Sequence, residues 1–241
     1  MTIKGQLTYI AHLYKAIFRQ HHKDLFYTNM APLIAKDGIV IDIGGHAGQF
    51  SKLFSKYLGT QGYVYSFEPG HYALSILRKV KSIKRLNNLE IVPKALGARR
   101  EEAQLHIPVK KSGSLGFGLS SIARPEDNNR KTVRHKIEII TLDDFVDDKK
   151  LQRLDFIKID IEGGEYDFLK GAEKTLEQFR PAILMEINGQ ALARHNANPQ
   201  DIDQFMRDLG YESYILQQGE FTKIPPPIPQ GDILWKKGQE Q

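Results

Sequence analysis

Acidic and basic side chains gather at the end of one predicted strand in the second half of the chain. The run LDFIKIDIEGGE, residues 154–165, has apolar residues at alternate positions, with Lys158, Asp160 and Glu162 between them. Alternate side chains of a strand project to one face, so these three are expected together near its carboxyl end. Charges at a buried strand end are unfavourable unless they pair or take part in chemistry. Asp160 and Glu162 are therefore candidate general bases, and Lys158 is expected to orient the base or stabilise an alkoxide, or else to lock the strand through an ion pair.

A glycine-rich turn follows an earlier apolar strand. Residues 38–58 read GIVIDIGGHAGQFSKLFSKYL, in which a β-branched run precedes three glycines, Gly44, Gly45 and Gly48. Apolar residues then recur at helical spacing. Strand, glycine turn and helix are typical of the opening of a βαβ nucleotide-binding unit. Glycine is expected there because the chain reverses tightly and a ligand must approach the backbone.

Two acids and a histidine indicate which ligand the turn would hold. Asp42 lies near the end of the first strand, and Glu68 closes a second apolar run, twenty residues past Gly48. An acid at that position can accept both hydroxyls of a ribose, which narrows the ligand to an adenosine-containing cofactor. His46 stands where G-x-G-x-x-G has its second glycine, so S-adenosylmethionine fits the loop better than NAD. A nicotinamide-dependent oxidoreductase remains an alternative.

Other polar residues are expected near the same strand ends. Lys94 and Ala95 follow a third strand, where an adenine would rest, and His195, in a polar loop, is an outside candidate for the base. A fifth strand delivers Glu186 to the same edge. No metal is assigned to the site. Because all-oxygen ligands suit magnesium or calcium, the alternative is a hard cation bridged by Asp160, Glu162 and Glu186.

The length fits one α/β domain over residues 1–241. The pattern over residues 1–30 predicts an N-terminal helical segment that is amphipathic and basic. Such a segment could lie on a membrane, but we expect it to cover the sheet or the cleft instead. Residues 98–140 contain strand-like pieces without a convincing helix, which predicts a small antiparallel β insertion over the cleft. Basic residues in this insertion could hold an acidic acceptor, although interleaved acids favour plain solvation.

Composition limits the classes of function. Without cysteines, the chain has no disulfides, thiolate metal sites or cysteine nucleophiles, and it fits a reducing cytoplasm, which is the expected location. No apolar run approaches a membrane span, and His12 and Lys15 interrupt any signal-peptide core. The net charge of +5 keeps an RNA methyltransferase as an alternative. Nucleic acid is nevertheless not the expected partner, because DIEG at residues 160–163 replaces the Asn/Asp-Pro-Pro-aromatic strand end of amino-group methylation.

Three motifs, VIDIGGHAGQFS, FEPG and DFIKIDIEGGEYDFLKGA, followed by RPAILMEIN, resemble those of the FkbM-type S-adenosylmethionine-dependent methyltransferases. The resemblance implies an α/β fold with a doubly wound, mostly parallel seven-stranded sheet, Rossmann-like and of class I, whose last strand is antiparallel. It also implies methyl transfer to a hydroxyl oxygen of a small-molecule or saccharide acceptor. The family's loop usually reads D-x-G-A-N-x-G, and Gly45 and His46 replace its alanine and asparagine.

Together, the residue patterns and the resemblance assign two groups of site residues. The cofactor is expected at Asp42, Gly44, Gly45, His46, Gly48, Glu68, Pro69, Lys94, Ala95 and Asp160. The methyl-transfer end would be lined by Lys158, Asp160, Glu162 and Glu165, with His195 beyond them.

Overall fold

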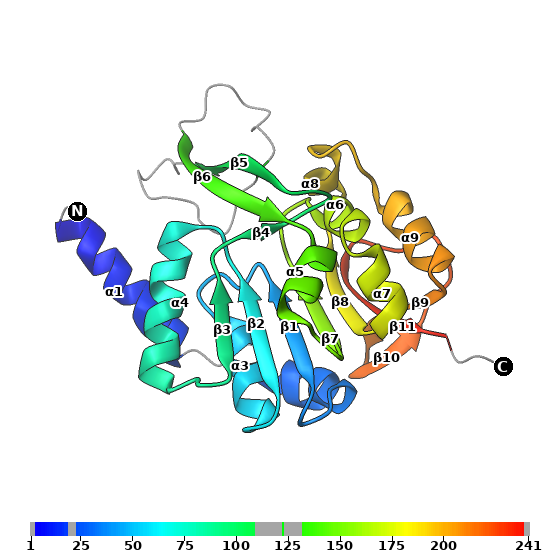
Figure 1. The fold of residues 1–241 in the computed structure, drawn as a ribbon, viewed down its shortest axis with the longest axis horizontal. Helices are drawn as coiled ribbons and strands as arrows, with labels where there is room; N and C mark the ends of the chain where they lie inside the picture. The colour runs from blue at the N-terminus through cyan, green and yellow to red at the C-terminus, as the bar shows by residue number, and fades with distance from the viewer. Residues whose placement is uncertain (1–2, 19–22, 109–121, 123–131, 239–241) are drawn as a thin grey trace.

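The computed structural model describes residues 3–18, 23–108, 122 and 132–238. Eight strands of these residues form one twisted sheet with helices on both faces (Figure 1). In spatial order they are β10 (Glu220–Lys223), β9 (Tyr211–Gln217), β11 (Gly231–Lys237), β8 (Ala182–Ile187), β7 (Phe156–Ile159), β1 (Ile39–Ile43), β2 (Tyr63–Phe67) and β3 (Leu89–Val92).

The sheet is mostly parallel, which confirms the predicted fold class. Strands β3, β2, β1, β7 and β8 run parallel, and β11 runs antiparallel to both β8 and β9. The predicted number of seven strands is wrong by one, because β10 adds a further edge strand that pairs antiparallel with β9. Gln218 and Gly219 join β9 to β10 with positive φ at both positions, the geometry of a two-residue hairpin turn.

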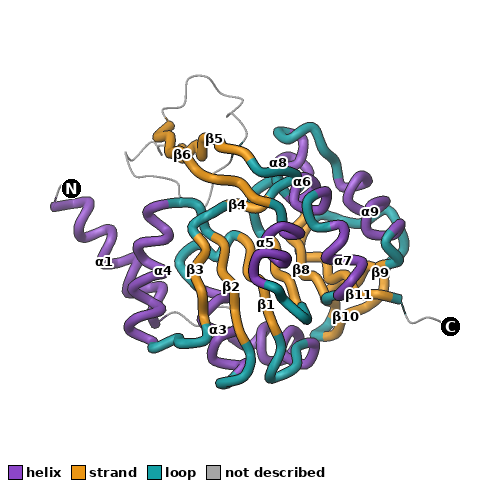
Figure 2. The backbone as a smooth tube through the Cα atoms, viewed as in Figure 1, coloured by secondary structure: helices purple, strands orange, loops and turns teal. Residues whose placement is uncertain are grey.

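Two layers of helices cover the sheet (Figures 1 and 2). Alternation along β1 sends Val40 into the hydrophobic cluster on one face and Ile41 into the cluster on the other. The Val40 face is covered by α3 (Gln49–Leu58) and α4 (His71–Lys84), and the Ile41 face by α5 (Leu142–Lys149), α6 (Glu165–Lys170), α7 (Glu173–Phe179) and α9 (Pro199–Asp208).

The N-terminal segment is helical but does not lie where the sequence predicts. Helix α1 (Ile3–Phe18) packs along the outside of α4, at the edge of the molecule, where the Tyr9 and Tyr72 rings meet edge to face at 5.7 Å. The expectation that this segment covers the sheet or the cleft is wrong for α1, because α3 and α4 already occupy that face, but Phe26 and Met30 of the same predicted segment are buried in one cluster with Val40 of the sheet. Three short helical turns connect α1 to β1, namely α2 (Lys23–Leu25), the π-helix η1 (Phe26–Met30) and the 3₁₀-helix η2 (Ala31–Leu33).

The predicted insertion forms a second, small sheet at the carboxyl-end side of the main one (Figure 1). Strand β5 (Glu101–Pro108) pairs antiparallel with β6 (Thr132–Ile140), as expected, and β4 (Ala95–Leu96) adds a parallel edge to β6. The strand expected over 117–122 lies outside the described residues except for Ile122.

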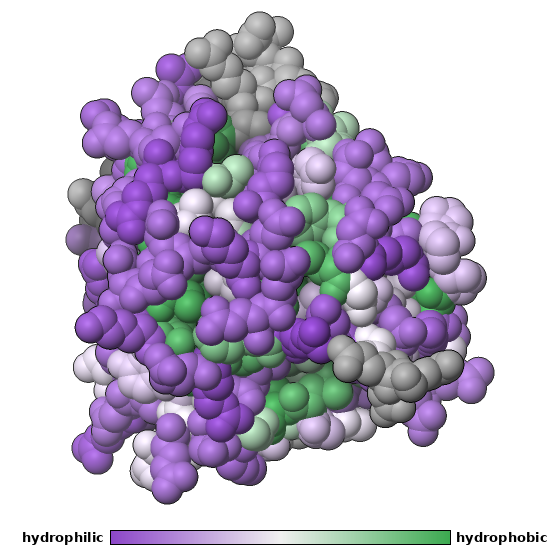
Figure 3. Space-filling view, turned by 45° about the vertical axis from the view of Figure 1, so that its right-hand side comes forward, coloured by the Kyte–Doolittle hydropathy of each residue, from purple (hydrophilic) through white to green (hydrophobic). Residues whose placement is uncertain are grey.

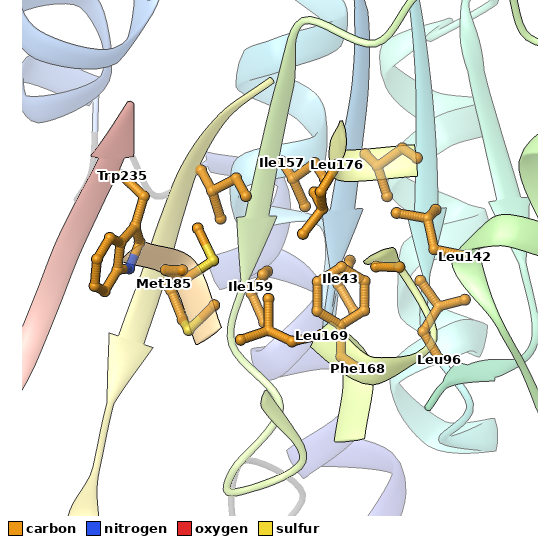
Figure 4. Packing of buried hydrophobic residues seen from close by; sticks show 14 of the residues in the cluster. Ile43, Leu96, Leu142, Ile157, Ile159, Phe168, Leu169, Leu176, Met185 and Trp235 are labelled. Carbon is orange, nitrogen blue, oxygen red and sulfur yellow. The ribbon is translucent and has the colours of Figure 1, made fainter. Parts of the chain in front are cut away.

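Buried side chains fix the strand ends relative to one another. Figure 4 shows the larger cluster, in which Ile157 and Ile159 of β7, Met185 of β8 and Trp235 of β11 pack with side chains of the helices. The face drawn in Figure 3 is largely hydrophilic, with apolar side chains visible mainly between polar ones. None of the helices in the described part of the chain is both long and apolar enough to cross a bilayer.

Candidate active site

A cavity of about 480 Å³ opens at the carboxyl ends of β1, β2, β7 and β8. This is the edge at which open α/β sheets bind ligands. Among its lining residues are nearly all of the predicted site residues: Asp42, Gly44, Gly45, His46, Glu68, Pro69, Lys94, Ala95, Lys158, Asp160, Glu162 and His195. Gly48 and Glu165 do not line it.

The glycines of the first turn let strand ends approach one another. The amides of Gly44 and Gly45 donate to the Phe67 carbonyl at 3.0 and 2.9 Å, which ties the turn to the end of β2. A Cβ at Gly44, where φ is +78°, would overlap the carbonyl oxygen of Asp160, and one at Gly45 would overlap Ser66 Oγ. The close contacts that require glycine are therefore made by the protein itself, in addition to any made by a ligand.

Gly48 lies behind the turn instead of on the cavity wall. It precedes α3 with φ of +79°, and a Cβ there would sit 2.6 Å from Leu77 of α4. Glycine is therefore required at this position by the packing of α4 and by the positive φ. Because Gly48 is not among the residues that line the cavity, its predicted role in holding the cofactor gains no support.

Asp42 is buried directly beneath the turn, 1% exposed. Its Oδ2 accepts a hydrogen bond from Ser51 at 2.5 Å, whereas its Oδ1 has no hydrogen-bond partner among the described residues. Burial raises the pKa of Asp42, and the positive charge of Lys158 opposes that shift. A buried acceptor without a donor is unfavourable, so Asp42 fits a role in binding a hydrogen-bond donor of a ligand.

Glu68 holds the other side of the turn. Its two carboxylate oxygens accept from the backbone amides of Gly70 at 2.7 Å and His46 at 2.9 Å. Burial raises its pKa to about 7, although both amide bonds favour the charged form. Each oxygen can accept a second hydrogen bond, so the carboxyl group retains the capacity to bind two ribose hydroxyls from the cavity.

His46 adopts the left-handed conformation, with φ of +45°, while its amide donates to Glu68. Its ring lines the cavity, where Nε2 is buried without a hydrogen-bond partner among the described residues. Burial lowers the pKa of His46, which keeps the ring neutral near pH 7. Like Asp42, it presents an unused polar atom to a ligand.

The transfer end of the cavity contains one buried cation among several acids. Lys158, 6% exposed, places Nζ 3.0 Å from Asp160 Oδ2 and 4.9 Å from the centre of the Phe50 ring. Burial opposes ionisation of Asp160, but the charge and hydrogen bond of Lys158 outweigh it, so the pKa of Asp160 is lowered. Asp160 is therefore a carboxylate held in its charged form.

Glu186 of β8 lies beside Asp160 and was not among the predicted catalytic residues. Partial burial, then the negative charge of Asp160 and a hydrogen bond shared with it, raise the pKa of Glu186 to about 7. Asp232, directly across the β8–β11 pair from Glu186, also lines the cavity. It comes from an antiparallel strand near the end of the chain, so the motifs around residue 160 gave no signal for it.

Glu162 and Glu165 differ from their predicted placement. Strand β7 ends at Ile159, so Glu162 does not continue the alternation but lies in the following turn, with φ of +56°, on the cavity wall. Glu165 is turned inward, where Oε1 accepts from the amides of Gly163 at 3.2 Å and Ile161 at 3.4 Å. It fixes the turn that carries Glu162. Burial raises the pKa of both acids.

His195 lies just after α8 (Gly189–Ala193), at the rim of the cavity. Its Nδ1 is 4.0 Å from Oδ2 of Asp167, and burial lowers its pKa. A neutral imidazole on the cavity wall remains a candidate base.

Part of the cavity wall is apolar. Pro69 and Ala95 line it together with two residues that sequence reasoning missed, Leu105 of β5 and Ile122. Lys94 forms an ion pair with Glu138 of β6, with Nζ 2.6 Å from Oε1. This wall suits a flat heterocycle such as adenine. Within the described ranges no group of three His, Asp or Glu side chains is placed to hold a metal ion, so the alternative of a bridged cation gains no support from this geometry.

The profile of the methyltransferase FkbM domain matches residues 42–213, which run from the first acid of the turn to β9. The chain belongs to the FkbM methyltransferase family. This confirms the resemblance drawn from the motifs, and with it a methyltransferase that uses S-adenosylmethionine. The nicotinamide-dependent alternative is thereby set aside.

Individual relatives of this FkbM methyltransferase are distant. "Methyltransferase 1" of Beauveria bassiana is 25% identical over 168 residues, which cover 63% of this chain and 66% of the relative. "2-O-methyltransferase NoeI" of Sinorhizobium fredii is 26% identical over 163 residues, which cover 65% of each chain. The matches thus span about two thirds of these relatives' lengths.

Solved structures support the fold. An FkbM methyltransferase from Methylobacillus flagellatus superposes with a TM-score of 0.55 at 16% identity, over 84% of this chain and 44% of that one. A methyltransferase from Streptococcus mutans in complex with SAH gives a TM-score of 0.50 at 10% identity, over 89% and 96%. At such identities the likeness concerns the fold alone.

Proposed function

We propose that residues 1–241 act as one O-methyltransferase domain, which methylates a hydroxyl group of a neutral, hydroxyl-rich acceptor such as a saccharide. The observation that carries the proposal is the Asp160–Glu186 carboxyl pair on the wall of the cavity. The name of the relative NoeI, a 2-O-methyltransferase, agrees with transfer to oxygen.

The buried polar atoms of the turn that have no partner among the described residues support a position for the cofactor. Glu68 would hold the ribose hydroxyls, and Asp42 and His46 would accept donors of the same ligand at the atoms that have no partner among the described residues. The adenine would lie against Ala95 and Leu105. When bound, the cofactor supplies a methyl group already activated on a sulfonium. The protein's remaining task is to position the acceptor oxygen and remove its proton.

Asp160 and Glu186 suit the removal of that proton. Asp160 is kept charged by Lys158, while Glu186 titrates near pH 7, where a general base is most effective. The pair can therefore receive the acceptor's proton on Glu186 while Asp160 stabilises the protonated form through their shared hydrogen bond. Base catalysis of this kind contributes about 10²–10⁴-fold, and alignment of the acceptor up to about 7–11 kcal/mol.

The charge of the cavity wall favours a neutral acceptor over the acidic one considered from the sequence. Glu162, Glu186 and Asp232 line the transfer end, and carboxylates accept hydrogen bonds from hydroxyl groups but repel an anionic acceptor. Lys94 is paired with Glu138. Of the basic residues in the insertion that could hold an acidic acceptor, those at 110, 111, 124, 130 and 131 lie outside the described residues.

Labelled S-adenosylmethionine with a panel of neutral glycans, uronic-acid glycans, polyketide alcohols and RNA tests the proposal. Neutral glycans should be labelled at oxygen, and labelling of RNA alone would overturn the assignment. Asp160→Asn should lower turnover by at least about 100-fold while SAH affinity changes little. Glu177→Gln, which changes an exposed acid of α7 outside the cavity lining, is the matched control. If turnover and SAH affinity fell together in Asp160→Asn, Asp160 would serve the cofactor or the fold instead.

A further inference from the structure

Helix α1 has two apolar faces, of which the fold uses only one. Its inner face packs on α4 through Tyr9, Leu13 and Ala16. Its outer face is solvent-exposed and carries Leu7, Ile10, Tyr14 and Phe18, whose exposed fractions are 63, 60, 64 and 58%. Their spacing of three and four residues makes one continuous stripe along the helix.

The stripe continues onto the end of α4. Lys84 lies 5.0 Å from the centre of the Phe18 ring, and its neighbour Ile83 is 55% exposed. Among the described residues six large apolar side chains are exposed, and five of them belong to this patch, Leu7, Ile10, Tyr14, Phe18 and Ile83. An apolar patch of this kind on an otherwise polar protein indicates an interaction surface.

The two helices that form the patch carry charges of one sign. Helices α1 and α4 contain no Asp or Glu and six basic residues, Lys4, Lys15, Arg78, Lys79, Lys81 and Lys84. Of these, Lys15, Arg78 and Lys79 are exposed. An apolar stripe flanked by Lys and Arg is the pattern of helices that lie in the interface of anionic membranes.

We propose that the patch formed by α1 and the end of α4 binds the surface of an anionic lipid bilayer, with α1 lying in the plane of the interface. A second copy of the chain fits less well, because a two-fold contact would bring these cations against their own counterparts. Helix α1 has sixteen residues, fewer than a bilayer span needs. None of the described residues of α1 lines the methyl-transfer cavity, so the surface is separate from that site.

Sedimentation of the full chain with vesicles tests the proposal. We expect binding to phosphatidylcholine vesicles that contain about one third phosphatidylserine, little binding to phosphatidylcholine alone, and weakening by salt. The double variant Leu7→Glu/Ile10→Glu should lower the partition coefficient at least about tenfold. Leu216→Glu, which changes an exposed leucine of β9 that is 38% exposed, is the matched control and should bind as the wild type does.

A charge variant keeps the test decisive if the apolar variant does not fold. Lys15→Glu/Arg78→Glu changes two exposed side chains and should also lower binding at least about tenfold, because cations close to an anionic bilayer surface strengthen binding. Equal binding of wild type and both variants, or no binding of wild type to anionic vesicles, would overturn the proposal. So would light scattering that shows a wild-type dimer which Leu7→Glu/Ile10→Glu converts to a monomer.

Discussion

Replacing Glu68 by glutamine should stabilise the protein at alkaline pH while weakening its hold on the cofactor. Burial keeps the Glu68 carboxyl protonated up to about pH 7, whereas its ordinary pKa is 4.5. The folded state therefore binds more protons than the unfolded state between these values, and this contribution to stability is lost as pH rises through the window. The separation corresponds to about 3 kcal/mol.

Glutamine does not ionise, so the variant does not lose stability as pH rises. Its side chain has one acceptor oxygen, however, so it can accept only one of the two hydrogen bonds that the backbone amides of Gly70 and His46 now donate to Glu68. One buried donor without a partner costs about 1 kcal/mol. The variant Glu68→Gln should therefore match the wild type near pH 5 and exceed its free energy of unfolding by about 2 kcal/mol at pH 8. For a domain of this size that difference raises Tm by about 4–8 °C.

Thermal unfolding at both pH values, without ligand, measures the effect. Glu177→Gln, which changes an exposed acid of α7, is the matched control. The difference in Tm between this variant and the wild type should be the same at both pH values. SAH titration of the same variants at pH 8, where Glu68 is ionised, should show affinity lowered about 10–100-fold in Glu68→Gln, because charged acceptors of the ribose hydroxyls are lost. If Glu68→Gln were the less stable protein at pH 8 as well, Glu68 would be ionised in the fold and the reasoning would be refuted.

Three further predictions concern the transfer end and the turn. In Glu186→Gln, kcat should fall about 10²–10⁴-fold, and the rise toward pH 7 that deprotonation of this carboxyl should give the wild type should be lost; an unchanged pH profile would exclude Glu186 as the base. In Lys158→Met, the pKa of Asp160 should rise and stability at pH 7 should fall by about 1 kcal/mol, because solvent screens the half-exposed Asp160; carboxyl NMR titration and urea unfolding measure the two effects. Gly44→Ala should lower stability by about 1–3 kcal/mol more than Gly59→Ala, since both glycines have positive φ but nothing lies within 4 Å of a Cβ at Gly59; equal Tm values would contradict this.

The sequence predicts those parts of the site that lie within a few residues of a strand end. Asp42, Glu68 and Lys158 are found in this way because parallel strands bring their carboxyl ends to one edge. Asp232 could not be found, because its place beside Glu186 depends on the register of an antiparallel strand. A local pattern contains no information about such a pairing.

Turn geometry accounts for most other differences. Alternation predicted that Glu162 continues β7, but positive φ at Glu162 and Gly163 turns the chain first, and the sequence IEGG does not distinguish these two paths. The sequence predicts α1 as an amphipathic helix, yet which of its apolar residues pack on α4 and which stay exposed depends on the tertiary fold. The hairpin at Gln218 and Gly219 was missed because Gln-Gly is a weaker turn signal than Asn-Gly.

The most direct test of the account is a crystal structure of the protein with SAH. We expect the ribose against Glu68, the adenine beside Ala95 and the sulfur directed toward Asp160 and Glu186. SAH bound elsewhere, or bound with its sulfur facing away from the Asp160–Glu186 pair, would contradict the proposed site.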